Sequence, residues 1–359
     1  MPGTDSVYVI AEAGVNHNGS LQRALQMVDV AAAAGADAVK FQTFRAERLV
    51  SRRARMADYQ IANMGESGSQ FDMLRRLELS DSDHVALSER CRERGIEFLS
   101  TAFDEASLHF LHGLGMSRIK VPSGDLTAAP LVLAAARLGK PLIVSTGMAT
   151  LAEVQEALGV IAFGITGSGD PSRAAFVAAY ADPEAQRQLR ESVTLLHCVT
   201  EYPAPPEQVN LRAMDVLREA FGLRAGYSDH TLGTAVATAA VARGASVIEK
   251  HFTLDRDLPG PDHKASLVPD ELARLIADIR TIELALGRAA KEPAASEQKN
   301  IPVARRSLVA ATEIRKGERF AASNLTVKRP GDGASPYRYW ELLGTSAPRD
   351  YAADEPIDP

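Results

Sequence analysis

The feature that most constrains the fold of this chain is an alternation of short apolar runs with longer segments of helical periodicity. The runs are rich in β-branched and aliphatic residues, which favour strands, and most are followed by apolar residues at helical spacing. Gly35, Gly95 and Gly244 end three of the helical segments in C-cap position. The eight apolar runs are residues 7–11, 38–42, 96–100, 118–121, 141–145, 193–198, 225–228 and 246–250.

The number of these units predicts a closed (β/α)8 TIM barrel of class α/β. A doubly wound open sheet shows the same alternation, so the count of eight strands is what favours the barrel. Two connections, residues 44–81 and 148–191, are too long for one helix and predict inserted loops or extra helices. We expect the main helices over residues 21–34, 82–94, 231–243 and 269–286.

The pattern changes at the end of the predicted barrel, which spans residues 1–286. Residues 287–303 are polar, rich in alanine and broken by prolines, which predicts a linker. Residues 304–359 contain two short β-like runs, at 307–311 and 325–328, separated by turn signals. We therefore expect a small β-rich domain at the end of the chain.

Charge and cysteine content narrow the class of ligand. The chain has 40 Lys and Arg against 46 Asp and Glu, a formal charge of -6. This net negative charge does not favour binding to nucleic acid. Its apolar runs are shorter than the ~20 residues that span a bilayer, so we expect no membrane partner. Two distant cysteines, Cys91 and Cys198, and an N-terminus without a secretory pattern predict a cytoplasmic protein. We expect a small-molecule ligand.

Polar residues stand at the end of every predicted strand, where a barrel carries its active site. Lys40 and Lys120 lie inside strands; an inward ammonium group must be paired and would match an anionic substrate. An outward lysine that reaches solvent between helices is the alternative for each. Ser123 follows the predicted strand of Lys120, and Ser145 ends the next predicted strand. Both can donate to phosphate or carboxylate oxygens, which favours the inward orientation.

Two histidines end adjacent strands. His230 and His251 are 21 residues apart, the length of one helix with its loops, so both imidazoles could reach one ion. Two protein ligands leave positions for water or substrate, which suits a catalytic metal, although a histidine at a strand end is more often a hydrogen-bonded core residue. Glu12 in a barrel indicates acid–base work or hydroxyl binding. Asp262 could bind sugar hydroxyls or cap the following turn.

Several long motifs stand in order along the whole chain. In the predicted barrel they are AEAGVNHNGS (11–20), DAVKFQTF (37–44), IKVPSGDLT (119–127), PLIVSTGMAT (141–150), LLHCVTEYPAP (195–205), GYSDHTLG (226–233) and IEKHFTLDRDLPGPDHKAS (248–266). Together these segments resemble the sialic acid synthase family of bacterial N-acetylneuraminate synthases and their legionaminate relatives. The C-terminal segments RRSLVAATEIRKGE (305–318) and NLTVKRPGDG (324–333) resemble that family's antifreeze-like (SAF, β-clip) domain.

The resemblance implies a reaction and a set of site residues. Phosphoenolpyruvate would condense with the open-chain aldehyde of an N-acylated amino sugar, with release of phosphate, in a domain-swapped homodimer. His230 and His251 would hold a divalent metal, usually manganese, with magnesium and cobalt as alternatives. Arg329 would reach the sugar of the partner subunit. Phosphoenolpyruvate would be bound by Lys40, Lys120, Ser123, Ser145 and Thr200, and the sugar or attacking water by Glu12, Gln42, Asp125, Tyr202 and Asp262.

The identity of the sugar stays open at this point. We expect N-acetylmannosamine, which would make the chain an N-acetylneuraminate synthase. The alternative is a legionaminate or pseudaminate synthase that uses a diacetamido-trideoxyhexose with the same chemistry. A non-catalytic sugar or anion sensor and a generic metal aldolase are disfavoured, because acid–base, metal-binding and paired anion-binding groups occur together. Asp125 departs from the family pattern, since many members have glutamate there.

Overall fold

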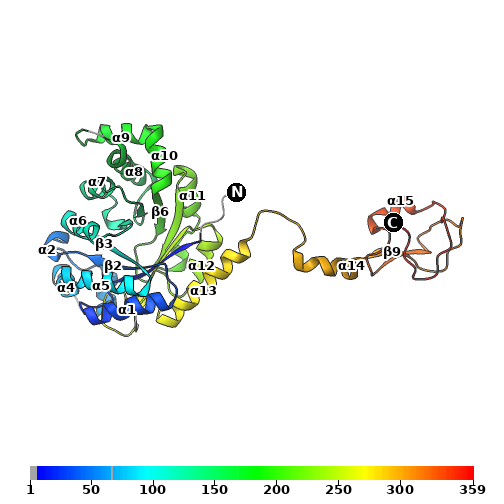
Figure 1. The fold of residues 1–359 in the computed structure, drawn as a ribbon, viewed down its shortest axis with the longest axis horizontal. Helices are drawn as coiled ribbons and strands as arrows, with labels where there is room; N and C mark the ends of the chain where they lie inside the picture. Colours follow the sequence, from blue (N-terminus) through cyan, green and yellow to red (C-terminus); the bar gives the residue numbers. More distant parts are fainter. Residues whose placement is uncertain (1–5, 66–67, 168) are drawn as a thin grey trace. The chain divides into compact units, whose positions relative to one another are not determined.

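The computed structural model describes residues 6–65, 68–167 and 169–359, which form two compact units that meet between Gly287 and Arg288. In the first unit eight parallel strands form one ladder, in the order β3-β2-β1-β8-β7-β6-β5-β4. The end strands β3 and β4 lie in contact and close the ring, which confirms the predicted (β/α)8 barrel (Figure 1). The strands are β1 (Tyr8–Gly14), β2 (Ala38–Thr43), β3 (Glu97–Ala102), β4 (Ile119–Val121), β5 (Leu142–Ser145), β6 (Val193–Cys198), β7 (Arg224–Asp229) and β8 (Val247–His251).

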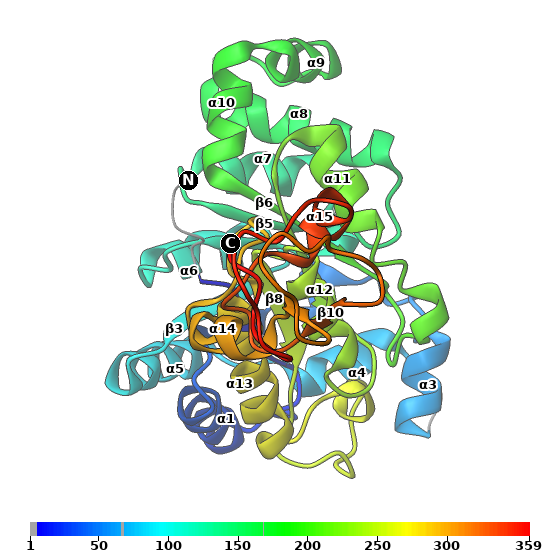
Figure 2. The same ribbon diagram turned by 90° about the vertical axis from the view of Figure 1, so that its right-hand side faces the viewer.

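Helices surround the strands (Figure 2). The two long connections contain the extra helices α2–α4 and α8–α10 that their length predicts. The helices of this unit are α1 (Leu21–Ala33), α2 (Ala46–Leu49), α3 (Asp58–Met64), α4 (Gln70–Leu77), α5 (Asp81–Arg94), α6 (Glu105–Gly113), α7 (Ala129–Arg137), α8 (Leu151–Thr166), α9 (Arg173–Ala181), α10 (Pro183–Ser192), α11 (Ala213–Phe221), α12 (Ala235–Ala242) and α13 (Pro269–Leu286), with 3-10 turns η1 (Ser123–Asp125), η2 (Pro206–Gln208) and η3 (His263–Ala265).

One predicted helix boundary is wrong by four residues. We expected a helix from residue 231, but α12 begins at Ala235. The backbone N–H of Thr231 donates to the Asp229 carboxylate at 2.8 Å, and its carbonyl oxygen accepts from the Lys250 ammonium group at 2.5 Å. Because side chains at the ends of β7 and β8 occupy these backbone groups, residue 231 belongs to the loop that joins strand to helix.

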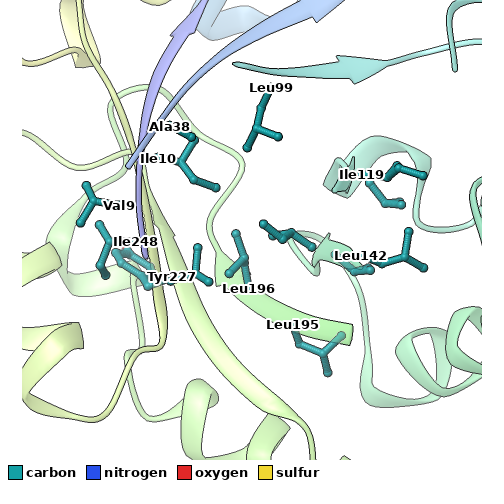
Figure 3. Close-up of a cluster of buried hydrophobic side chains, with 14 of the residues drawn as sticks. Val9, Ile10, Ala38, Leu99, Ile119, Leu142, Leu195, Leu196, Tyr227 and Ile248 are labelled. Carbon is teal, nitrogen blue, oxygen red and sulfur yellow. The ribbon is translucent and has the colours of Figure 1, made fainter. Parts of the chain in front are cut away.

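Strand alternation places an apolar layer inside the barrel, beneath the polar residues at the strand ends. Ile10, Leu99 and Leu196 precede Glu12, Thr101 and Cys198 by two positions and therefore share their face. All three apolar side chains are at most 2% exposed and lie on the inside of the ring in Figure 3. The polar strand ends thus rest on a packed apolar floor, which positions them rigidly.

The second unit pairs β9 (Ser307–Ala310) with β10 (Leu325–Lys328) in antiparallel register and has its own core around Leu308, Phe320 and Tyr351. Residues 288–304 group with this unit and contain η4 (Ala295–Asn300) and α14 (Ile301–Ala304). The unit ends with η5 (Pro336–Arg338) and α15 (Tyr339–Leu342). In the described residues of both units, no helix is long and apolar enough to cross a membrane.

Candidate active site

A cavity opens at the carboxyl ends of the barrel strands. Its volume is about 230 Å³, close to the lower end of the ~300–1,000 Å³ that is usual for small-molecule sites. Eleven of the residues predicted from the sequence line it together: Glu12, Lys40, Gln42, Lys120, Ser123, Ser145, Thr200, Tyr202, His230, His251 and Asp262.

Both strand lysines point into this cavity and share two buried carboxylates. Lys40 Nζ lies 2.8 Å from Glu12 Oε2 and 3.7 Å from Glu249 Oε2, and Lys120 Nζ lies 3.5 Å from Glu249 Oε1. The parallel register brings Glu12 level with Lys40 on one side and His251 on the other. We call this group of four charged side chains the inner cluster: Glu12, Lys40, Lys120 and Glu249. Each is at most 5% exposed, so its charge is neutralised by the other members and not by water.

Burial and ion pairing shift the pKa values of the four inner-cluster groups in different directions. Burial raises the pKa of Glu12 above its usual value, although Lys40 opposes the shift. Burial also acts to raise the pKa of Glu249, but Lys120 and Lys40 outweigh it and lower that pKa overall. Burial lowers the pKa of Lys120, whereas for Lys40 the two glutamates overcome burial and raise it. Glu249 is therefore the fixed anion of the inner cluster, and Glu12 is the carboxyl group able to exchange a proton near neutral pH.

Hydroxyl groups surround Lys120 beside the turn that follows β5. Lys120 Nζ donates to Ser145 Oγ at 2.7 Å, and Gly147 N–H donates to Ser123 Oγ at 3.0 Å. A Cβ atom at Gly147 would lie 2.5 Å from Thr200 Oγ1 and 2.8 Å from Ser123 Oγ, so only glycine allows the backbone this close to both hydroxyls. An ammonium group, hydroxyls and a backbone turn at one place form a cradle suited to phosphate or carboxylate.

The two strand-end histidines face each other across the β7–β8 edge of the cavity, with ring centroids 5.5 Å apart. His230 Nδ1 donates to the Val199 carbonyl at 2.6 Å, which leaves its Nε2 lone pair on the other side of the ring. Among the described residues, His251 Nδ1 is buried without a hydrogen-bond partner. Burial lowers the pKa of His230 to about 4 and that of His251 well below its usual value. Both imidazoles are therefore neutral at pH 7.

Neutral imidazoles, each with an unprotonated nitrogen, fit a divalent cation, and the His230 Nε2 atom has only a long contact of 3.5 Å to Ser228 Oγ. The described part of the chain contains no group of three or more His, Cys, Asp and Glu side chains that could hold a metal ion by themselves. The histidine pair can supply two ligands, and the remaining positions would be filled by water and substrate, as in catalytic sites. Tyr202 stacks on His230 with a centroid distance of 4.0 Å and fixes the orientation of that ring.

Two predicted site residues do not line the cavity. Asp125 lies in η1 and is absent from the cavity lining among the described residues; burial raises its pKa to about 6. Arg329 follows β10 in the second unit, and its contact with the sugar of a partner subunit stays a prediction.

Several residues that line the cavity had no expected role from the sequence. Glu249 stands two positions before His251 on β8, so the period of two alone would have placed both on the inner face. Cys198 also lines the cavity, with its Sγ 3.0 Å from Ser123 Oγ. Helix α4 adds Met73, Leu74 and Leu77, which the long connection after β2 concealed.

Comparisons with known proteins agree with this geometry. The chain is 47% identical to N,N'-diacetyllegionaminic acid synthase of Campylobacter jejuni, over 97% of this chain and 98% of that protein. It is 44% identical to the N,N'-diacetyllegionaminic acid synthase of Legionella pneumophila, over 94% and 89%. A crystal structure of N-acetylneuraminic acid (sialic acid) synthetase from Leptospira borgpetersenii, in complex with citrate, matches with a TM-score of 0.68 and 33% identity, over 83% of this chain and 91% of that one.

Family models match both units. The SAF domain model matches residues 305–359, which confirms the predicted antifreeze-like domain. The NeuB family model matches residues 27–291, most of the barrel. These matches confirm the predicted phosphoenolpyruvate-dependent, carbon–carbon bond-forming transferase of the sialic acid synthase type. With its barrel, its strand-end cavity and its C-terminal domain, the chain belongs to the NeuB family.

Proposed function

We propose that this protein is an N,N'-diacetyllegionaminic acid synthase, which condenses phosphoenolpyruvate with the open-chain aldehyde of a diacetamido-trideoxyhexose and releases phosphate. The observation that carries the proposal is the identity of 47% and 44% to two synthases of that name, against 33% to a sialic acid synthetase. The alternative weighed in the sequence analysis is therefore better supported than N-acetylmannosamine as the substrate.

Phosphoenolpyruvate binds at the lysine and hydroxyl side of the cavity. Lys120 and Ser145, with Ser123 and Thr200 around Gly147, receive one anionic group, and Lys40 with Thr101 receives the other. Both lysines lie beside Glu249, whose negative charge offsets the repulsion between the two ammonium groups. A trianionic substrate adds the negative charge that two buried ammonium groups can accept.

The reacting carbons meet between the two sides of the cavity. C3 of phosphoenolpyruvate attacks the sugar aldehyde carbon, and the positive charge that develops at C2 is quenched by water. Glu12, which has a raised pKa and lies 2.8 Å from Lys40, orients that water and takes its proton. The tetrahedral intermediate then expels phosphate, whose charge is held by Lys40 and Lys120.

His230 and His251 would hold a divalent cation, manganese being our first expectation. Such a cation, when bound, supplies Lewis-acid polarisation of the sugar aldehyde, which phosphoenolpyruvate needs because its enol carbon is a weak nucleophile. Asp262, at the same side of the cavity, accepts hydrogen bonds from sugar hydroxyls, and Tyr202 holds the imidazole of His230 in place.

Phosphate release from phosphoenolpyruvate tests the proposal. The chelator-treated protein is assayed with and without manganese, with a diacetamido-trideoxyhexose or N-acetylmannosamine. We expect metal-dependent release that is at least about tenfold faster with the diacetamido sugar, since its extra groups contribute binding in the transition state. Faster release with N-acetylmannosamine would contradict the proposal. His251→Ala serves as the folded, inactive control, verified by its unchanged circular dichroism.

A further inference from the structure

One wall of the cavity differs chemically from the rest. Met73, Leu74 and Leu77 of α4 line the cavity together with Val15 and Phe103, whereas much of the remaining lining consists of lysines, glutamates and hydroxyl groups. The three α4 side chains, which we call the α4 wall, present only methylene, methyl and thioether groups. They belong to a small apolar cluster with Phe44 and Met56 that is separate from the barrel core.

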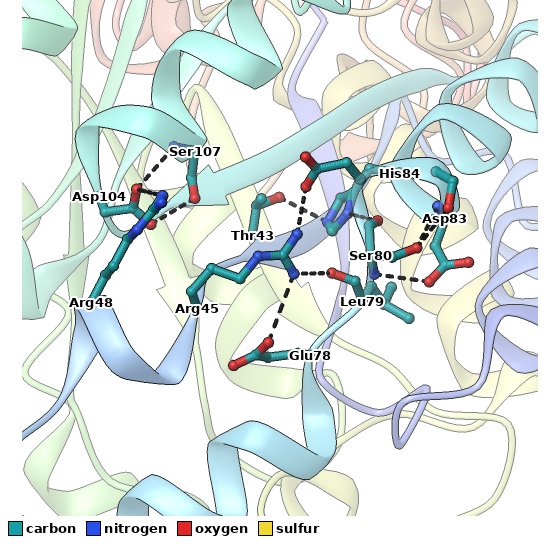
Figure 4. A network of polar contacts seen from close by, with 12 residues as sticks. Thr43, Arg45, Arg48, Glu78, Leu79, Ser80, Asp83, His84, Asp104 and Ser107 are labelled. Atoms are coloured by element: carbon teal, nitrogen blue, oxygen red, sulfur yellow. Dashed lines mark hydrogen bonds and ion pairs between the residues drawn. The ribbon is translucent and has the colours of Figure 1, made fainter. Parts of the chain in front are cut away.

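Helix α4 is fixed at its C-terminal end to the segment that follows β2. The Arg45 guanidinium group donates to the Leu79 carbonyl at 2.8 Å and lies 3.7 Å from the Glu78 carboxylate (Figure 4). The Ala46 N–H donates to the same carboxylate at 2.6 Å. The segment that follows β2 is therefore joined to the segment that precedes α5, with α4 between them. The α4 wall is preorganised and does not have to order when a substrate binds.

A close backbone contact also fixes the side of α4 that faces β1. A Cβ atom at Gly19 would lie 2.6 Å from the carbonyl oxygen of Arg76, and Gly19 has a φ of +71°. Only glycine permits this approach of the loop after β1 to the last turn of α4. The α4 wall thus has a defined distance from Glu12 and the other residues at the end of β1.

The chemistry of the wall selects which part of the sugar it receives. The aldehyde carbon and its neighbours must lie near the strand-end lysines and histidines, because the reaction occurs there. The α4 wall comes from an inserted helix and not from a strand end, so it receives the distal end of the open chain. A hydroxymethyl group placed there would lose its hydrogen bonds to water without replacement, whereas a methyl group loses nothing.

We infer that the α4 wall binds the C6 methyl group of the sugar and thereby selects 6-deoxy substrates over 6-hydroxy ones. This inference rests on the proposed function and adds the residues that determine its specificity. An apolar pocket discriminates against one added hydroxyl by roughly 10- to 100-fold, which sets the size of the expected preference.

Two sugars that differ only at C6 provide the test: N-acetylmannosamine and its 6-deoxy analogue. The ratio of their kcat/KM values is measured for the wild-type protein, Leu74→Gln and Leu74→Met. We expect the wild type and Leu74→Met to favour the 6-deoxy sugar by about tenfold or more, and Leu74→Gln to lower the ratio toward one, since its amide can hydrogen-bond the hydroxyl. Leu49→Gln is the matched control: Leu49 packs on the same cluster but does not line the described part of the cavity.

The outcomes separate this inference from the proposed function. If Leu74→Gln slows both sugars equally, or leaves the ratio unchanged, the wall contacts a group that both sugars share and the inference is wrong. The proposed function survives that result as long as the wild type prefers the diacetamido sugar over N-acetylmannosamine. If the wild type prefers N-acetylmannosamine, the proposed function fails first and the inference with it. A change of ratio in Leu49→Gln would show that the effect comes from packing alone.

Discussion

Three lysines lie in the barrel strands, two on the inner face of the barrel and one on its outer face, and their surroundings differ. Lys40 and Lys120 point inward, where Lys40 lies 2.8 Å from Glu12 and 3.7 Å from Glu249, and Lys120 lies 3.5 Å from Glu249. Lys250 points outward from β8, toward the helices, and is fully buried. It lies 2.8 Å from Asp229 Oδ2, and the other oxygen of that carboxylate accepts from the backbone N–H and the hydroxyl of Thr231.

The outer pair of Lys250 and Asp229 and the inner cluster differ in how fully their charged groups are paired and hydrogen-bonded. In the outer pair, Lys250 also donates to the Thr231 carbonyl, so both charges are enclosed by short contacts. In the inner cluster, within the described residues, Glu249 Oε2 has no hydrogen-bond partner and its lysine contacts exceed 3.4 Å. A buried polar group that lacks a hydrogen-bond partner costs free energy, and a ligand that supplies the partner removes this cost. We infer that the outer pair serves stability and the inner cluster serves binding.

The largest expected effect is a loss of stability on breaking the outer pair. Lys250→Met removes one partner and leaves the Asp229 carboxylate buried without its countercharge, which costs about 3–5 kcal/mol. Urea denaturation followed by circular dichroism measures the loss in free energy of unfolding. A loss below about 1 kcal/mol would contradict the assignment of this pair to stability.

The inner cluster should give the opposite result. Lys120→Met leaves Glu249 paired with Lys40, so we expect the free energy of unfolding to change by no more than about 1 kcal/mol. Phosphate release should fall by about 10²–10³-fold, because one of two ammonium groups that stabilise the departing phosphate is gone. Steady-state kinetics and denaturation of the same preparation check both expectations. A variant as unstable as Lys250→Met would remove the distinction between the two regions.

Asp262 is a second test of the difference between the two regions. It lines the cavity, and no cation among the described residues pairs with it as Lys250 pairs with Asp229. Burial raises its pKa to about 7 from an ordinary value of 3.8. If its carboxylate accepts from sugar hydroxyls, kcat/KM for the sugar should rise about tenfold between pH 6 and pH 8. The free energy of unfolding changes in the opposite direction. Because Asp262 holds a proton in the folded state at a pH where it has lost it in the unfolded state, its contribution to stability falls as pH rises from about 4 to 7. Asp262→Asn should flatten that part of the kinetic profile, and an unchanged profile would exclude Asp262 from the site.

The barrel could be predicted from the sequence because each strand is a local pattern. Apolar runs followed by helical periodicity located all eight strands, and polar residues at their ends located eleven side chains that line the cavity. The inward direction of Lys40 and Lys120 required the register of neighbouring strands, since an outward lysine is equally compatible with a buried run. Lys250 is such an outward lysine.

The remaining features depend on contacts between distant segments. The α4 wall could not be predicted because Leu74 reaches the cavity through an insertion whose path is set by Arg45, Glu78 and Leu79. The late start of α12 depends on Lys250, which is 19 residues away from the Thr231 carbonyl that it binds. A pattern within one segment carries no information on such partners.

The smallest expected effects come from two matched hydroxyl deletions, one in each region. Thr231→Val removes one of two hydrogen bonds to Asp229 Oδ1, and the backbone N–H of residue 231 keeps the other, so the free energy of unfolding should fall by about 1 kcal/mol with kcat unchanged. Ser228→Ala removes the hydroxyl that donates to Glu249 Oε1 at 3.0 Å inside the cavity. We expect it to lower kcat/KM for phosphoenolpyruvate by about fivefold with little change in stability, since Glu249 then shifts toward the lysines. If both variants lost stability and kept full activity, the inner cluster would be structural as well.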